Sequence, residues 1–461
     1  MNNDIFQGYK GDALKILQKY KVRVWGAAVI DTTRGTFEGT VLPRAENDDD
    51  QHIVIKIITG YNIGIDVTTI KTMKETGYKK ANYKIPEKEF PVTKGLPKVK
   101  LFGTGGTIAS RLDYRTGAVI PAFSPGELYG AVPELADICN LETEKVFAVF
   151  SENMGGKQYV SLAKVIGKEI EKGVDGIVIG HGTDTLHHTG AALTFMCQNL
   201  PVPVVLVGSQ RSSDRPSSDA ALNLMHAMKA AGHSDIAEVM VCMFGPTSDE
   251  YGLLHKGTRV RKMHSSYRST FRTIGDTPLA MISRKEITPI KKQYNHRRKD
   301  KKVKILPYFS DEVTMLYYSP GMKPDVLDAM VDAGYKGIIF VGTGLGHVNK
   351  ELYPAIERAH AKGVHMFMTL QTIWGYVQMF VYDTGRDMMA KGIIPAGNML
   401  PEVAWVKLSW ILGQTNNPEK VKEMMLTPVN DEITLREPYN GYLVYQGGVP
   451  EVEAFIKKVH K

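Results

Sequence analysis

The segment LFGTGGTIASRLDY, residues 101–114, places hydroxyl groups directly after a short apolar run. They belong to Thr104, Thr107 and Ser110. The glycines between them let a backbone approach a bound molecule, and the amides of Gly105 and Gly106 are candidates for stabilising an oxyanion. A threonine is a weak nucleophile unless a base or a cation lies beside it. By itself, this segment therefore predicts only a ligand-binding turn.

The same glycines raise the alternative of a phosphate-binding loop. A P-loop has the pattern G-x-x-x-x-G-K-[ST], and residues 103–110 contain no lysine to contact the outer phosphates. The dinucleotide pattern G-x-G-x-x-G is matched only in its first half. A second glycine segment, GTGLGH at residues 342–347, is equally incomplete. We therefore favour a catalytic turn over a nucleotide-binding loop.

A second polar cluster follows the apolar run in GIVIGHGTDTLHHTG, residues 176–190. Thr183, Asp184 and Thr185 open a predicted helix there, and helix capping would explain one such residue but not three in a row. Three histidines, His181, His187 and His188, lack metal-ligand spacing, so we expect them at the surface.

A third segment, KGTRVRKMHSSYRSTF at residues 256–271, is basic and polar. A lysine from it, placed beside Thr183 and Asp184, would complete a Thr–Lys–Asp relay. Lysine acts as a base only where burial or neighbouring groups lower its pKa. The sequence does not show this proximity, and a solvated loop remains the alternative.

Composition indicates a cytoplasmic protein without a membrane span. No apolar run approaches the roughly 18 residues that a span needs, and the first residues lack the pattern of a signal peptide. The cysteines, Cys139, Cys197 and Cys242, lie far apart and are expected as buried thiols. The formal net charge of +8 is compatible with an acidic partner such as RNA. The basic run at residues 291–304 is either a solvated linker or a salt-sensitive phosphate contact.

The pattern of apolar segments predicts an α/β protein behind a small β-barrel. Residues 21–70 contain short alternating runs separated by glycine, proline and acidic turns, as in a small barrel. From residue 98, apolar strands alternate with helical segments, which indicates doubly wound, mainly parallel sheets. The predicted units are a helix and barrel (1–85), a linker (86–97), a large α/β domain (98–285), a basic connector (286–310), a small C-terminal domain (311–428) and a tail (429–461).

Three motifs in this order give the sequence a family resemblance. TGGTIAS followed by DYRTG, then HGTDT, then RVRKMHS resemble the bacterial-type L-asparaginase family, and the similarity covers roughly residues 98–414. By this resemblance, Thr107 corresponds to the nucleophilic threonine of the first motif. Thr183 and Asp184 correspond to the second motif, and Lys262 completes the relay. The resemblance leaves open which threonine attacks first.

The same resemblance assigns substrate contacts. Tyr114 corresponds to the tyrosine of a flexible lid. Ser151 and Glu152, in FSENM, correspond to the pair that binds the α-carboxylate and α-amino groups of the substrate. The resemblance implies an enzyme that needs neither a metal nor a cofactor in this chain.

Two features differ from a stand-alone asparaginase. The Gly-Asn-Gly-Asn segment that this family supplies to a neighbouring subunit is GLGH here, at residues 344–347, which leaves the preference between asparagine and glutamine open. The predicted barrel and basic connector are instead similar to the GatD family, the amidase subunits of archaeal glutamyl-tRNA(Gln) amidotransferases.

The second resemblance implies partners as well as an activity. It implies a GatE subunit that uses ATP and Mg²⁺, a heterotetramer of two GatD and two GatE chains, and tRNA(Gln) in the complex. The implied amide donor is glutamine or asparagine, and no membrane is involved. Two alternatives remain: a stand-alone cytoplasmic asparaginase and a non-catalytic tRNA-binding scaffold.

Overall fold

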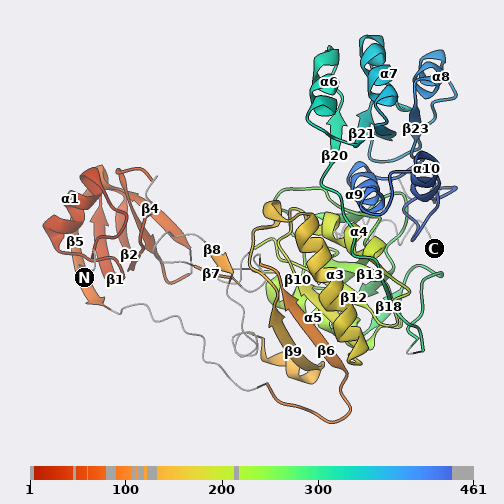
Figure 1. The fold of residues 1–461 in the computed structure, drawn as a ribbon. Helices are drawn as coiled ribbons and strands as arrows, with labels where there is room; N and C mark the ends of the chain where they lie inside the picture. The colour runs from red at the N-terminus through yellow and green to blue at the C-terminus, as the bar shows by residue number, and fades with distance from the viewer. Residues whose placement is uncertain are drawn as a thin grey trace, which may run out of the picture.

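The computed structural model describes residues 5–44, 48–59, 61–78, 90–105, 110–112, 119–121, 132–211, 217–298 and 300–438. Figure 1 shows an N-terminal β unit, a large α/β sheet and a smaller C-terminal α/β sheet. No helix in these ranges is both long and apolar enough to cross a membrane.

The N-terminal unit is a five-stranded antiparallel sheet with one helix packed on it. The sheet has the order β4-β3-β2-β1-β5, so its last strand returns to the edge of its first. Alternate residues of β1 are buried, as expected for a sheet with one face on a core. The helix adds Ala13 and Leu17 to this core. The elements are α1 (Gly11–Tyr20), β1 (Gly26–Thr32), β2 (Gly35–Val41), β3 (His52–Lys56), β4 (Asn62–Asp66), η1 (Val67–Thr69) and β5 (Ile70–Tyr78).

The large sheet has eight strands in the order β18-β17-β14-β13-β12-β10-β6-β9. The five strands from β13 to β9 are parallel, and β14, β17 and β18 continue the sheet antiparallel. Its strands are β6 (Lys98–Gly103), β9 (Asn140–Lys145), β10 (Gly176–Gly180), β12 (Val204–Val207), β13 (Val239–Phe244), β14 (Gly252–Lys256), β17 (Ala280–Ile282) and β18 (Ile287–Pro289).

Helices cover both faces of this sheet, because its central parallel strands β10 and β12 are apolar on both sides. In β10, Ile177 and Ile179 pack with α3 (Gly156–Glu171) and α4 (Leu186–Met196). Val178 faces the opposite way and packs with α5 (Ala220–His233). This is the doubly wound arrangement predicted from the sequence.

The C-terminal sheet is parallel, in the order β20-β21-β22-β23. One face packs with α6, α7 and α8, and the other joins the core of the large sheet. Helix α9 is buried along its length and lies against α4, so it connects the two sheets. The elements are β20 (Val313–Tyr317), α6 (Pro324–Asp332), β21 (Gly337–Gly342), η5 (Lys350–Leu352), α7 (Tyr353–Ala361), β22 (His365–Leu370), α8 (Asp383–Ala390), β23 (Ile393–Pro395), α9 (Pro401–Leu412) and α10 (Pro418–Leu426).

Short elements complete the fold around the large sheet. Two antiparallel strand pairs, β7 with β8 and β15 with β16, lie outside the main sheets. Strand β11 pairs with β19 from the basic run. These elements are β7 (Ser110–Leu112), β8 (Val119–Pro121), η3 (Pro133–Asp137), η4 (Ser151–Asn153), β11 (Cys197–Gln198), β15 (Val260–Lys262), β16 (Phe271–Thr273) and β19 (Lys304–Ile305).

The basic run at residues 291–304 lies along the large sheet. The Arg297 guanidinium donates to backbone carbonyl oxygens of Ala231 at 2.8 Å and Ser234 at 2.9 Å, and also to that of Asp175. Lys291 Nζ donates to Asp276 at 2.5 Å and to Asp431 at 3.0 Å. These two cations are therefore engaged inside the protein rather than free for solvent or phosphate.

Candidate active site

Two neighbouring strand ends create the framework of the site. Gly103 at the end of β6 lies opposite Gly180 at the end of β10. Just beyond, the backbone N–H and the hydroxyl of Thr104 both donate to the Gly180 carbonyl, at 3.1 and 2.9 Å. Gly105 has a φ of +117°, and a Cβ there would lie 2.3 Å from the Val149 carbonyl oxygen, so the turn requires glycine. Ligands of open α/β sheets bind at such carboxyl ends.

The predicted relay residues meet beside these strand ends. Lys262 Nζ donates to Thr183 Oγ1 at 2.9 Å and to Asp184 Oδ1 at 2.7 Å. The lysine side chain is 10% exposed and the aspartate side chain is 68% exposed, so the cation is sheltered while its counter-charge faces solvent. Thr183 and Asp184 precede α4, and Lys262 ends β15. The structure thus brings together three residues that two separate segments supply.

Ser151 and Glu152 lie in η4, next to the loop that carries Thr183. The Ser151 carbonyl accepts a hydrogen bond from Thr185 Oγ1 at 2.6 Å, so this hydroxyl does not cap α4. A Cβ at Gly182 would lie 2.8 Å from Ser151 Cβ, which shows how closely the two loops approach. Glu152 is exposed at this position.

Three predicted site residues, Thr107, Gly106 and Tyr114, lie outside the described residues. The described part of the site therefore consists of Gly105, Ser151, Glu152, Thr183, Asp184 and Lys262.

Comparisons with known proteins extend over nearly the whole chain. Matching families are Asparaginase, N-terminal (residues 98–295), Glutaminase/Asparaginase C-terminal domain (312–425) and GatD N-terminal domain (28–74). The GatD subunit of the glutamyl-tRNA(Gln) amidotransferase of Pyrococcus abyssi is 46% identical over 413 residues, covering 88% of this chain and 93% of that protein. The corresponding protein of Methanothermobacter thermautotrophicus is 44% identical over 428 residues, covering 93% of this chain and 98% of that protein. This chain belongs to the GatD family of glutamyl-tRNA(Gln) amidotransferase subunits.

The two α/β sheets of this GatD family member are similar in structure to solved asparaginases. The L-asparaginase from Thermococcus kodakarensis matches with a TM-score of 0.65 and 30% identity, over 73% of this chain and 99% of that one. L-asparaginase I from Vibrio cholerae matches with a TM-score of 0.65 and 26% identity, and the match covers 74% of this chain and 100% of that one. The predicted asparaginase-like fold and the predicted family are both confirmed.

The prediction that the histidines of residues 176–190 lie at the surface is wrong. His181 is fully buried; its Nδ1 lies 2.6 Å from the Gly182 carbonyl and its Nε2 lies 2.8 Å from Thr189 Oγ1. Since a carbonyl only accepts, we place the proton on Nδ1. Burial lowers the pKa of His181 to about 4, and also lowers that of His187. His187 lies in α4, which packs against α9, and the sequence does not reveal that contact.

A partly buried ion pair next to Lys262 was not predicted. Arg261 NH1 lies 3.1 Å from Oε2 of Glu402, in the first turn of α9. Burial raises the pKa of Glu402, and the nearby Arg261 opposes that rise. The two residues are 141 positions apart, and neither occurs in a motif that would have connected them.

Arg259 anchors the chain directly before β15. Its Nε donates to the Asp431 carbonyl at 2.6 Å, and NH1 donates to the Asn398 carbonyl at 3.0 Å. The side chain is 1% exposed. Residues after 428, which carried no recognisable sequence signal, thus hold the segment that presents Lys262.

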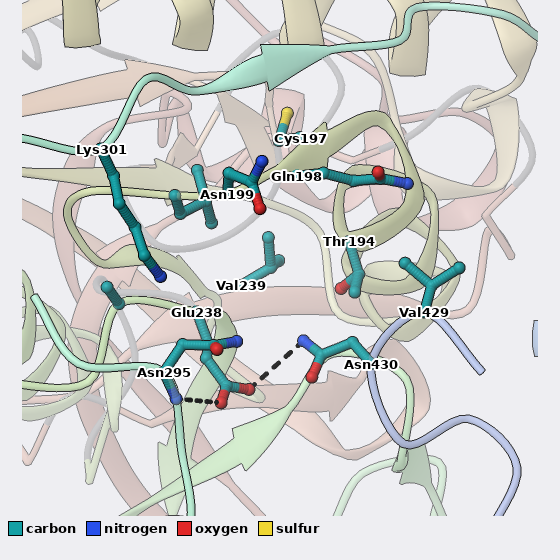
Figure 2. A pocket seen from close by; sticks show the side chains of 12 residues that line it. Thr194, Cys197, Gln198, Asn199, Glu238, Val239, Asn295, Lys301, Val429 and Asn430 are labelled. Carbon is teal, nitrogen blue, oxygen red and sulfur yellow. Dashed lines mark hydrogen bonds between the residues drawn. The ribbon is translucent and has the colours of Figure 1, made fainter. Parts of the chain in front are cut away.

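A cavity of about 180 Å³, whose lining side chains are drawn in Figure 2, contains none of the relay residues in its lining. Its lining includes the end of α4 and the start of β13, whereas Asp184 precedes the start of α4. There Asn295 N donates to Glu238 Oε1 at 3.0 Å, and Asn430 Nδ2 donates to Oε2 at 3.3 Å. These bonds connect the basic run and the tail to the large sheet. Among the described residues, no group of three or more His, Cys, Asp or Glu side chains could hold a metal ion.

Proposed function

We propose that this chain is the amidase subunit of a glutamyl-tRNA(Gln) amidotransferase and releases ammonia from glutamine. The observation that carries the proposal is the position of Lys262 Nζ, 2.9 Å from the Thr183 hydroxyl and 2.7 Å from the Asp184 carboxylate. These three groups lie beside the carboxyl ends of β6 and β10 in an asparaginase-like sheet. A hydroxyl beside a lysine and a carboxylate suits nucleophilic attack on an amide.

In the proposed reaction, Thr107 Oγ attacks the carbon of the side-chain carboxamide. Its proton passes to Lys262, which must be neutral to accept it, with Thr183 bridging the two groups. The same proton then goes to the leaving nitrogen, the C–N bond breaks and ammonia departs. Water hydrolyses the resulting acyl-enzyme ester. The assignment of the first attack to Thr107 rather than Thr183 is part of the proposal.

The remaining predicted residues bind and orient the substrate. Ser151 and Glu152 hold its α-carboxylate and α-amino groups, and Tyr114 closes over it. Asp184 orients the lysine or holds the substrate ammonium. Amides at Gly105 and Gly106 stabilise the oxyanion, and one such donor contributes on the order of 3 kcal/mol to the transition state.

The ammonia then serves a second subunit. In the proposed complex, GatE uses ATP and Mg²⁺ to phosphorylate the glutamate carried by tRNA(Gln), and ammonia displaces the phosphate. We propose a cytoplasmic, archaeal complex with two GatD and two GatE chains. The support for this assignment is the similarity to GatD proteins along nearly the whole chain.

The test is amidation of Glu-tRNA(Gln) by the complex, with either glutamine or ammonium chloride as the nitrogen donor. Thr107→Val should abolish amidation with glutamine because the attacking hydroxyl is lost. It should leave amidation with ammonium intact, because the partner's chemistry does not need the amidase site. Continued use of glutamine by this variant would overturn the assignment of Thr107.

The wild-type protein distinguishes the rival functions in the same assay. Full-rate hydrolysis of free asparagine without GatE would favour a stand-alone asparaginase. Amidation that uses ammonium but never glutamine or asparagine would favour a non-catalytic scaffold.

A further inference from the structure

The ion pair between Arg261 and Glu402 connects the strand of Lys262 to the C-terminal sheet. Glu402 lies in the first turn of α9, and its side chain is 6% exposed. The positive end of the helix dipole favours a carboxylate at this position. The ion pair thus joins β15 to the first turn of α9, the helix that packs against α4.

The environment of Glu402 is unfavourable for a carboxylate that has only a structural role. Within the described residues, Oε1 has no hydrogen-bond partner, and His187 Nε2 lies 4.0 Å from it. A buried carboxylate that leaves one oxygen unpaired destabilises the folded state. Arg261 is the cation that opposes this effect. A pair that costs stability here is better explained by a role in the adjacent site.

The short strand β15 explains why a side-chain anchor matters here. The strand has three residues and pairs only with β16 within the described structure, through Lys262 opposite Phe271 at its end. Successive side chains of a strand point to opposite faces. Fixing Arg261 on one face therefore fixes the direction of Lys262 on the other. His187, the second residue of α4, also approaches Glu402, with its Nε2 4.0 Å from Oε1.

We propose that Glu402 and Arg261 are positioning residues that hold Lys262 within hydrogen-bond distance of Thr183 and Asp184. The C-terminal sheet then contributes to the rate of amide hydrolysis without touching the substrate. This inference rests on the proposed function, because it concerns the rate of that reaction.

The experiment is a double-mutant cycle on glutamine hydrolysis by the complex, with Glu402→Gln, Arg261→Met and the double variant. Misplacement of a catalytic group by about 1 Å lowers rates by about 100-fold, so we expect kcat to fall roughly 10- to 100-fold in Glu402→Gln. KM should stay within about two-fold, because binding groups are unchanged. The double variant should be no slower than the slower single variant, since the residues act as one unit.

The matched control is Glu75→Gln in the N-terminal unit. Glu75 accepts from Arg23 at 2.5 Å, and its side chain is 16% exposed, so the variant breaks a comparable ion pair far along the chain. Its kcat should equal that of the wild-type protein. Unchanged kcat in Glu402→Gln, or losses in the two single variants that add in the double variant, would overturn the inference.

Hydrogen exchange of the amides at residues 260–262 gives a readout that needs no activity. Exchange should become at least several-fold faster in Glu402→Gln, and stay unchanged in Glu75→Gln. If the wild-type protein hydrolysed no amide, the proposed function would fail, while unchanged exchange would reject the anchoring itself.

Discussion

Two lysines of this protein form ion pairs of nearly equal length in opposite surroundings. Lys262 Nζ lies 2.7 Å from Asp184, and Lys407 Nζ lies 2.6 Å from Glu432. Lys407 and Glu432 are both 0% exposed, whereas the Asp184 side chain is 68% exposed. Distance alone therefore does not distinguish a structural pair from a candidate catalytic pair.

The difference lies in how completely the partners are satisfied. Lys407 also donates to the carbonyls of Met425 at 2.9 Å and Thr427 at 2.8 Å, so each of its N–H groups has a partner. Glu432 accepts from the backbone of Val429 and Asn430 as well. Within the described residues, Lys262 has only the Thr183 hydroxyl and the Asp184 carboxylate. A fully bonded lysine fixes the tail, while a partly bonded one can act on a substrate.

The largest effect that this comparison predicts is on the activity of Lys262→Met. Because the variant removes the proposed base, kcat for glutamine hydrolysis should fall by about 1,000-fold. The free energy of unfolding should change by less than about 1 kcal/mol, since an ion pair with an exposed carboxylate contributes little. Steady-state kinetics and urea unfolding measure the two quantities. Retention of more than a tenth of the activity would remove Lys262 from the catalytic set.

Glu432→Gln should show the reverse pattern. It leaves the Lys407 ammonium buried without its counter-charge, which lowers the free energy of unfolding by about 3–5 kcal/mol. The kcat per folded molecule should stay at the wild-type value, provided the measurement is made where the variant is folded. The double variant Lys407→Met with Glu432→Leu should also stay destabilised, because the carbonyls of Met425 and Thr427 and the amides of Val429 and Asn430 lose their partners. Loss of kcat in folded Glu432→Gln would mean that the two pairs are not independent.

The contrast also separates what the sequence could predict from what it could not. Apolar strands followed by glycine and hydroxyl residues indicated the α/β fold and the two turns near Thr104 and Thr183, because these are local patterns. The position of Lys262 beside Thr183 came only from family resemblance, since β15 lies far from α4 along the chain. The pair of Arg261 with Glu402 had no local signal. Boundaries of the predicted domains stay a prediction.

Burial that depends on packing between distant helices was also not visible in the sequence. His181 was expected at the surface because the histidines of residues 176–190 lack metal-ligand spacing, yet its ring is fully buried and bonded to Thr189 of α4. Arg297 occurs in a strongly basic run, yet its guanidinium donates hydrogen bonds to backbone carbonyls of the same chain. In both residues the local composition was misleading because tertiary contacts decide the environment.

His181 differs from both lysine pairs because its side chain is buried without a charge in the folded protein. Burial lowers the pKa of His181 from 6.5 to about 4, so the unfolded chain binds its proton first as the pH falls. Stability is therefore complete above about pH 6.5 and is lost progressively down to about pH 4. For this one residue the loss is about 3 kcal/mol.

His181→Asn tests this expectation, because asparagine does not titrate and its amide can replace the Nδ1–H donor. Urea unfolding at about pH 7 and about pH 4.5 should show a smaller decrease in stability for the variant than for the wild-type protein. Equal decreases would show that His181 does not contribute to the pH dependence.

The smallest predicted effect separates two neighbouring arginines of the basic run. Arg297→Ala should lower the free energy of unfolding by about 1–3 kcal/mol, because several backbone carbonyls lose their donor. Arg298→Ala should change it by less than about 0.5 kcal/mol, since the Arg298 side chain is 59% exposed. Binding of tRNA by the complex at low salt should be unaffected by Arg297→Ala, because that guanidinium is already engaged within the chain. Weaker tRNA binding in folded Arg297→Ala would show instead that the basic run contacts phosphate through this residue, and that its bonds to the large sheet are exchanged in the complex.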